Sequence, residues 1–328
     1  MSYRHPPAWL SDESLSPPPL VGPVLEAMTV AQRAGMWMRA RKPKTRVDAR
    51  VISFGNITAG GTGKTPAVIE RAQQEVAAGN QVAVITRGYG SAPTKEPLIV
   101  PPTQRAVPEQ IGDEASLIRL RVPGVWVVKS ADRVAGARAA ITEGCTCLIL
   151  DDGFQSLDLE RDQDIVLLDA SHPFGNGHLI PRGILRELPS ALARATEVWL
   201  TRCDIAPNLD VSITAVMRYH GKPPVRLTRH APIALWRLCD SAMFGLDIVR
   251  GKEVFLACGI ARPEAFERTV AELGATVSGR LYQRDHQAFR ADALPKEGMV
   301  LVTEKDAVRL PGARDNIYAL AVCLEDFT

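Results

Sequence analysis

Long hydrophobic runs, a surplus of charge of one sign and paired cysteine motifs are all missing from this sequence, and each absence excludes a class of protein. No segment approaches the roughly 20 consecutive apolar residues of a membrane-spanning helix, so we expect no span. Residues 1–19 are rich in proline and serine and lack the apolar centre of a signal peptide. The 39 Lys and Arg nearly balance the 37 Asp and Glu, and a net charge of +2 does not indicate a nucleic acid partner.

The six cysteines are scattered through the chain, and none belongs to a Cys-x-x-Cys pair or a Cys/His cluster with zinc spacing. Most stand within apolar runs, which is typical of small buried hydrophobic side chains. This usage predicts a reducing, cytosolic compartment.

What is present is the composition of a globular protein. The chain has 328 residues, 46% of them hydrophobic and 23% charged, enough apolar material for a core in one large or two modest domains. Short apolar runs alternate with helical patterns, as in a parallel sheet with helices on both faces. We therefore predict an α/β fold. The strands are expected over residues 51–54, 81–86, 126–129, 147–150, 165–169 and 198–201, and the helices from about residue 64 and over 135–141.

The last third of the chain repeats this alternation on a smaller scale. Proline and polar residues at 220–232 predict a linker. A strand at 253–258, a helix at 263–273 and a strand at 299–303 then predict a smaller C-terminal α/β domain. The predicted domains are residues 1–46, 47–220 and 221–328.

The N-terminal residues 1–46 combine an irregular arm with a basic helical segment. Prolines forbid a helix before residue 22, and a helical pattern with Met and Trp follows at 24–41. Such a helix can lie on an anionic membrane surface, or it can pack on the domain as an ordinary helix. The basic residues are Arg33, Arg39, Arg41, Lys42, Lys44 and Arg46.

The strongest motif is a glycine-rich segment between the first strand and its helix, Gly55-Asn56-Ile57-Thr58-Ala59-Gly60-Gly61-Thr62-Gly63-Lys64-Thr65-Pro66. Glycines let backbone amides approach phosphate oxygens, Lys64 can reach the outer phosphates and the Thr65 hydroxyl can bind magnesium. Thr58 stands where the general pattern has glycine. A strand followed by Gly-Lys-Thr and a helix indicates a P-loop rather than a structural turn.

A second motif ends the strand at 147–150 with Asp151, Asp152 and Gly153. In P-loop proteins an acidic residue at this point holds magnesium or its waters, although two carboxylates there can also cap a helix. Together with the P-loop, the pair predicts nucleotide binding and phosphate chemistry. It does not separate a kinase from a nucleotide-driven switch. Thr201-Arg202-Cys203-Asp204 is faintly similar to a guanine-reading motif, and we interpret Asp204 as a plain loop or cap residue.

Further ordered blocks resemble tetraacyldisaccharide 4′-kinase, the lipid A kinase of Gram-negative bacteria. The resemblance covers roughly residues 47–310. The blocks include Thr86–Gly90, Gly112–Glu114, Asp132-Arg133, Asp151–Gln155, Phe174–Gly177, Leu185–Glu187, Asp285-His286 and Thr303–Asp306.

This resemblance implies two domains with a cleft between them, and a peripheral location at the cytoplasmic face of the inner membrane. It implies transfer of the γ-phosphoryl of ATP, with Mg²⁺, to the 4′-hydroxyl of an acylated glucosamine disaccharide 1-phosphate in lipid A biosynthesis. It also favours a membrane contact for the N-terminal helix.

The family implies specific site residues in this sequence. Asp113 would accept the hydroxyl proton with His286 as its partner, although Asp113 could instead cap a helix and His286 could be an ordinary loop residue. Lys64 would act in catalysis, and Thr65, Asp151 and Asp152 would hold the metal. The expected nucleotide ligands are Thr58, Gly60, Gly61, Thr62, Gly63, Lys64 and Thr65. The substrate candidates, which could equally form surface ion pairs, are Arg87, Glu114, Arg133, Arg186 and Glu187.

The sequence departs from the family pattern at several positions. Ser156 replaces a usual histidine after Gln155, and Gln287 stands where a second histidine often follows His286. The departures could mean an altered acceptor preference or a catalytically weak ATP-binding paralogue. A P-loop NTPase switch is a separate alternative, but the Cys/His cluster or complete guanine motif expected of it is missing from the sequence.

Overall fold

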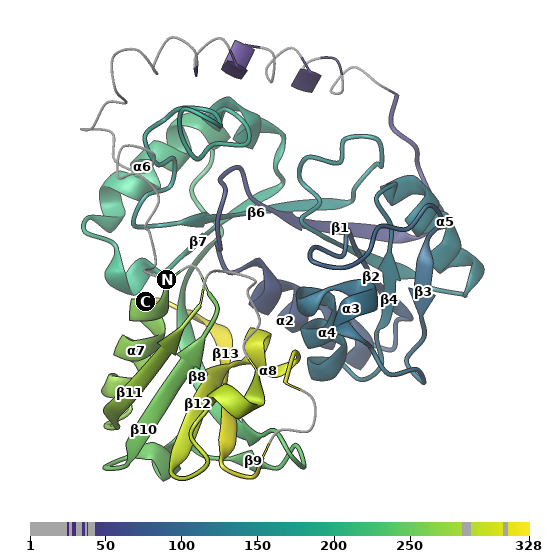
Figure 1. The fold of residues 1–328 in the computed structure, drawn as a ribbon. Coiled ribbons are helices and arrows are strands. Elements are labelled where there is room, and N and C mark those ends of the chain that lie inside the picture. Colours follow the sequence, from purple (N-terminus) through teal and green to yellow (C-terminus); the bar gives the residue numbers. More distant parts are fainter. Residues whose placement is uncertain are drawn as a thin grey trace.

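The computed structural model describes residues 25, 28–30, 35–36, 38, 43–260, 262–283, 290–310 and 314–328 (Figure 1). Three features predicted from the sequence lie outside these residues. They are the proposed base partner His286, the adjoining Asp285 and Gln287, and the basic side chains Arg33, Arg39, Arg41 and Lys42.

The larger half of the molecule is built on a mostly parallel sheet, which confirms the predicted α/β fold. The strand order across it is β3-β4-β2-β5-β1-β6-β7. Every neighbouring pair is parallel except β3 with β4. The strands are β1 (Arg50–Gly55), β2 (Val82–Thr86), β3 (Leu98–Val100), β4 (Trp126–Lys129), β5 (Cys147–Asp151), β6 (Gln163–Asp169) and β7 (Glu197–Thr201).

Helices cover both faces of this sheet, because its strands are apolar on both sides. In β5, Ile149 packs in one core with α2 and α4, whereas Leu148 and Leu150 pack with α5 on the opposite face. The helices are α2 (Lys64–Ala77), α3 (Pro108–Ile111), α4 (Asp113–Arg121), α5 (Arg133–Thr142), α6 (Leu209–His220), α7 (Pro263–Glu272) and α8 (Glu304–Ala307). Short 3-10 turns lie at Pro189–Arg194, Cys203–Ile205, Leu246–Val249 and Ala291–Ala293.

A long strand, β8 (Arg226–Arg237), carries the sheet from this half into the C-terminal half (Figure 1). Its first residues pair with β7, and its later residues pair antiparallel with β13 (Ile317–Asp326). The predicted linker at 220–232 is therefore wrong from residue 226 onward. The linker was predicted because Pro232 is uncommon inside a strand. This proline lies beside a register shift opposite Val322, where a strand tolerates a missing N–H.

The C-terminal half contains the predicted strands β10 (Glu253–Cys258) and β12 (Met299–Thr303) and the predicted helix α7. β11 (Thr276–Tyr282) and β9 (Met243–Phe244) complete it, and β10, β11, β12 and β13 are parallel neighbours. The division of the chain at residue 220 stays a prediction.

Part of the predicted N-terminal helix is described. Leu25, Met28–Val30, Gly35, Met36 and Met38 are helical, and Met28, Val30 and Met38 expose more than half of their surface. No helix within the described residues has the length and apolar character needed to cross a membrane.

Candidate active site

The glycine-rich segment forms a loop between β1 and α2, as the motif predicts. A neighbouring segment supports the first part of the loop: the Ala59 amide donates to the Ile184 carbonyl at 2.6 Å, and the Arg186 amide donates to the Ile57 carbonyl at 2.7 Å. Thr58 is 4% exposed and bridges to Leu185 in this contact. The loop is thus fixed on one side, while Gly60 and Gly61 remain exposed.

Gly63 needs glycine for two reasons. Its φ of 83° is left-handed, and a Cβ there would lie 2.8 Å from Nε2 of His230. We expect Gly63→Ala to lower the free energy of unfolding by about 1–3 kcal/mol, measured by urea denaturation. Gly61→Ala is the matched control, because Gly61 is not left-handed and a Cβ there has open space. Equal stability of the two variants would contradict this reading of the loop.

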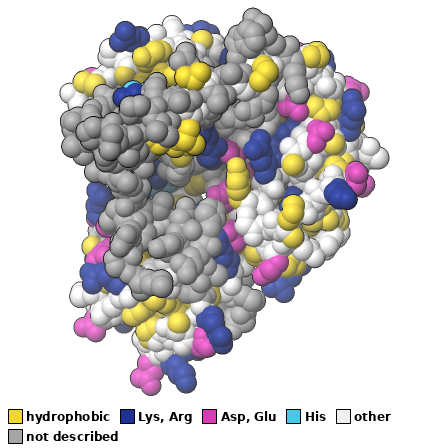
Figure 2. Space-filling model, turned by 45° about the horizontal axis from the view of Figure 1, so that its top comes forward, with side chains coloured by type: hydrophobic (Ala, Val, Ile, Leu, Met, Phe, Trp, Pro, Cys, Tyr) yellow, Lys and Arg dark blue, Asp and Glu magenta, His cyan; other side chains and the backbone are white. Residues whose placement is uncertain are grey.

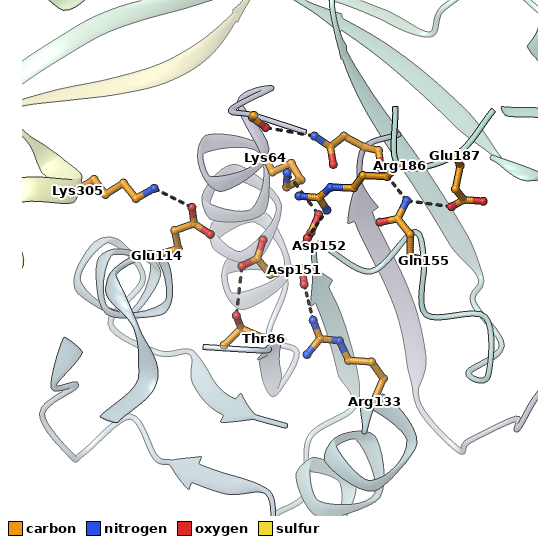
Figure 3. Close-up of polar contacts among 12 residues, drawn as sticks. Lys64, Thr86, Glu114, Arg133, Asp151, Asp152, Gln155, Arg186, Glu187 and Lys305 are labelled. Carbon is orange, nitrogen blue, oxygen red and sulfur yellow. Dashed lines mark hydrogen bonds and ion pairs between the residues drawn. The ribbon is translucent and has the colours of Figure 1, made fainter. Parts of the chain in front are cut away.

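The two aspartates lie next to the loop, as predicted (Figure 3). Asp151 ends β5 opposite Phe54 of β1, and Asp152 follows with a left-handed φ of 54°. Lys64 Nζ is 3.4 Å from Oδ1 of Asp152, and Arg186 Nη1 is 2.6 Å from its Oδ2. The carboxylates, the Lys64 ammonium and Arg186 therefore form one cluster. On the face in Figure 2, basic and acidic side chains lie side by side around a central hollow.

The two carboxyl groups differ electrostatically. Burial raises the pKa of Asp151, and the negative charges of Glu114 and Asp152 raise it further against the opposing effects of Lys64 and Arg133. Burial also acts to raise the pKa of Asp152, but the charges and hydrogen bonds of Lys64 and Arg186 outweigh it and lower that pKa. The charged form is thus favoured more strongly for Asp152 than for Asp151, and a cation bound nearby would favour ionisation of Asp151 as well.

The donor atoms fit a magnesium ion. Oδ1 of Asp151 is buried and accepts no hydrogen bond, and the neighbouring carboxylate and Thr65 hydroxyl add hard oxygen atoms. Within the described residues, no group of three or more His, Cys, Asp or Glu side chains could hold a metal by itself. Magnesium commonly uses only one or two carboxylates, with phosphates and water completing its shell.

Arg133 has a different role from the one expected of it. It is 1% exposed, and its guanidinium donates to the carbonyls of Ser130 at 2.7 Å and Asp151 at 2.8 Å. Burial lowers the pKa of this guanidinium to about 10. A buried side chain held by the main chain does not suit a substrate contact. It positions the acidic end of β5 instead.

We expect Arg133→Ala to lower the free energy of unfolding by about 3 kcal/mol, because it removes two hydrogen bonds and opens a cavity. Urea denaturation measures this loss. Arg138→Ala, on the exposed face of the same helix, should change stability by less than about 0.5 kcal/mol. Similar losses in the two variants would show that the Arg133 contacts contribute little.

The other substrate candidates fall into different environments. Glu187 is 5% exposed and pairs with Arg194 at 2.5 Å and with Gln155 Nε2 at 2.9 Å, so it is an internal support rather than an accessible group. Arg87 is exposed. Arg186 faces the aspartates, and Glu114 pairs with Lys305 at 3.1 Å (Figure 3).

Asp113 is the first residue of α4, and Gly112 occupies the N-cap, so the alternative interpretation of Asp113 as the cap is wrong. Asp113 is buried, and its carboxylate forms an ion pair with Arg309. Its charge partner comes from the C-terminal half, 196 residues away, and no local pattern indicated it. Ser156, where the resemblance implies a histidine, is 6% exposed and donates its amide to the Gly153 carbonyl at 2.9 Å.

Comparison with known proteins supports a nucleotide-dependent kinase site. The profile of the tetraacyldisaccharide-1-P 4′-kinase family matches residues 22–326. A tetraacyldisaccharide 4′-kinase of Anaeromyxobacter dehalogenans (strain 2CP-C) is 42% identical over 296 residues, 86% of this chain and 78% of the relative. One of Jannaschia sp. (strain CCS1) is 38% identical over 98% of this chain and 93% of its own length.

Among solved structures, LpxK from Aquifex aeolicus in complex with ATP superimposes with a TM-score of 0.74. It is 28% identical, and the match covers 92% of this chain and 91% of that one.

Proposed function

The chain belongs to the tetraacyldisaccharide-1-P 4′-kinase family, and from that premise we propose which of its groups perform each part of the reaction. Its activity is the ATP-dependent phosphorylation of the 4′-hydroxyl of tetraacyldisaccharide 1-phosphate in lipid A biosynthesis. A sugar hydroxyl is a weak nucleophile, so the protein must place it in line with the γ-phosphorus and offset the developing charge.

In this proposal the loop from Gly60 to Thr65 holds the triphosphate through its backbone amides, and Thr58 supports the loop from the side. Lys64 moves from Asp152 to the phosphates when the nucleotide binds, because a triphosphate carries more negative charge than one carboxylate. Arg186 keeps Asp152 ionised during this exchange through its 2.6 Å contact with Oδ2 of that carboxylate. The proposal rests on the 3.4 Å approach of Lys64 to Asp152 beside an exposed glycine loop.

Thr65, Asp151 and Asp152 would hold Mg²⁺. A magnesium ion held by these residues would supply positive charge that offsets the negative charge around the transferring group. Arg133 would support this function indirectly, since it fixes the Asp151 backbone.

Asp113 would accept the proton of the 4′-hydroxyl, and His286 would orient Asp113 or tune its basicity. Arg87, Arg186 and Glu114 remain the proposed contacts to the disaccharide and its 1-phosphate, because an arginine fork matches phosphate geometry.

The direct test of the activity uses purified protein with ATP, Mg²⁺ and tetraacyldisaccharide 1-phosphate, and follows labelled phosphate into lipid and into free phosphate. Transfer to the lipid is expected. Hydrolysis without transfer would indicate a nucleotide switch, and binding of ATP with neither product would indicate a catalytically weak paralogue.

We propose that the N-terminal helix brings the enzyme to an anionic membrane surface at the cytoplasmic face of the inner membrane. The exposed Met28, Val30 and Met38 support this, since an interfacial helix needs apolar side chains beside basic ones. Neutralising Arg39, Arg41 and Lys42 is expected to weaken binding to vesicles of anionic lipid roughly tenfold or more, as measured by sedimentation. Unchanged partitioning would count against the membrane contact.

A further inference from the structure

Nucleotide binding does not explain the segment Thr303-Glu304-Lys305-Asp306, which caps and begins the short helix α8. Two of its side chains anchor it in the C-terminal half. Asp306 is buried and its carboxylate accepts the Gly259 amide at 3.1 Å on both oxygens, and the Glu304 carboxylate accepts the Val322 amide at 3.0 Å. The Thr303 side chain caps the helix by accepting from the Asp306 amide. α8 is therefore held firmly by the strands around it.

Two basic side chains, one on α8 and one just after it, extend toward α4. Lys305 and Arg309 are four residues apart, a spacing that places both on one side of a helical turn. Lys305 Nζ lies 3.1 Å from Glu114 Oε1, and Arg309 pairs with Asp113 Oδ2. The two acceptors are the first two residues of α4. A cationic pair anchored in one half of the molecule thus meets an acidic pair in the other.

The Arg309 contact is the more enclosed of the two. The side chains of Arg309 and Asp113 are 11% and 9% exposed, against 21% and 30% for Lys305 and Glu114. A charge pair with little access to water is screened less and holds its geometry more strongly than an exposed one. The enclosed pair includes the carboxylate to which the proposed function gives the proton-accepting role.

We propose that Arg309 is a positioning residue for the phosphoryl transfer, which orients the Asp113 carboxylate and keeps it ionised. This inference rests on the proposed role of Asp113. A base must be deprotonated before it can accept the substrate proton, and an adjacent guanidinium favours the charged carboxylate. Because Arg309 cannot lose its proton near neutral pH, it performs this role across the working pH range.

Several other charged groups face the first turn of α4. Lys129 donates to the Gln110 carbonyl, just before α4, and the Tyr89 backbone packs against Gly112. Glu114 and Asp151 interact electrostatically. Among the described residues, the charged and titratable groups near the start of α4 therefore include Glu114, Lys305, Arg309, Lys129 and Tyr89, with Asp151 beyond Glu114.

The test compares full-length wild-type protein with Arg309→Gln and Arg309→Lys in the lipid kinase assay. Both substrates are saturating, and kcat is recorded from pH 5 to 9. Arg309→Gln is expected to lower kcat by about 10- to 100-fold with little change in either KM, because a misplaced base affects the chemical step. The acid limb of the pH profile of kcat for this variant should move to higher pH by about one unit. A carboxylate without a neighbouring cation stays protonated up to a higher pH. Arg309→Lys keeps the charge and should recover most of the rate and of the shift.

Arg121→Gln is the matched control. Arg121 joins α4 to α8 by an ion pair of 2.5 Å with Glu304, but it stands at the other end of α4 from Asp113. This variant weakens the same contact between the halves without touching the base, and its acid limb should coincide with that of wild type. An Arg309→Gln limb that coincides with wild type, or an equal shift in Arg121→Gln, would overturn the proposal.

A second measurement separates this inference from the proposed function. Asp113→Asn, Arg309→Gln and the double variant form a mutant cycle in urea unfolding, which needs no activity. A coupling of at least about fivefold in the unfolding equilibrium constant is expected for an enclosed ion pair. Absence of coupling would show that Arg309 does not stabilise the Asp113 carboxylate, even if the enzyme is active, and would overturn the inference. Strong coupling in a protein that phosphorylates no lipid would support the interaction between Arg309 and Asp113 and contradict the proposed function.

Discussion

Lys64→Ala is expected to lower phosphoryl transfer by at least about a thousandfold. The Lys64 side chain is 12% exposed, follows the glycine loop directly and brings its ammonium to 3.4 Å from Asp152. Without it, the negative charge that develops on the transferring group would face Asp152 with less compensation. The measurement is turnover in the lipid kinase assay.

The control is Lys252→Ala, which removes an exposed lysine from the C-terminal half and should leave turnover unchanged. Thermal unfolding of both variants separates lost chemistry from lost structure. Turnover of Lys64→Ala within about tenfold of wild type would show that the loop does not bind the transferring phosphate as proposed.

Asp113→Ala is expected to reduce turnover by about 100- to 10,000-fold while ATP affinity changes by less than about threefold. The reason is that a base acts on the reacting hydroxyl, whereas the nucleotide is held by the loop between β1 and α2. Single-turnover kinetics and titration with a fluorescent ATP analogue give the two quantities separately.

Alanine also removes the carboxylate from Arg309, so part of the loss could be structural. Asp113→Asn keeps the size of the side chain and one acceptor oxygen but cannot take the proton. Both variants should be slow, and the Asn variant should unfold closer to the wild-type temperature. Near wild-type turnover of the Asn variant at neutral pH would show that the base is misassigned.

The strands of the nucleotide-binding half could be read from the sequence because they are buried on both faces. β1, β5 and β6 form nearly continuous apolar runs, and such runs have few alternatives in an α/β protein. β11 was missed because its residues alternate between exposed and half-buried positions around a glycine. β8 was read as a linker because its central proline suggested a break, and only the register shift opposite Val322 shows how the sheet accommodates it.

The candidate site divides in the same way. The glycine loop and the two aspartates were predictable, since each depends on residues adjacent in sequence at the end of a strand. The positions of Arg133 and Glu187 were not, because a local pattern does not reveal whether a charged side chain turns outward or inward. The partners of Asp113 and Glu114 lie nearly 200 residues away and become visible only when α8 packs against α4.

In the proposed function, the loop from Gly60 to Thr65 and the carboxylates after β5 together hold a metal-bound triphosphate. A crystal structure with a non-hydrolysable ATP analogue and Mn²⁺ tests it directly, because the anomalous signal locates the ion. We expect the metal between the phosphates and Asp151 or Asp152, with Lys64 turned from Asp152 to the phosphate oxygens. A metal bound elsewhere, or phosphates outside the glycine loop, would contradict this proposed nucleotide site.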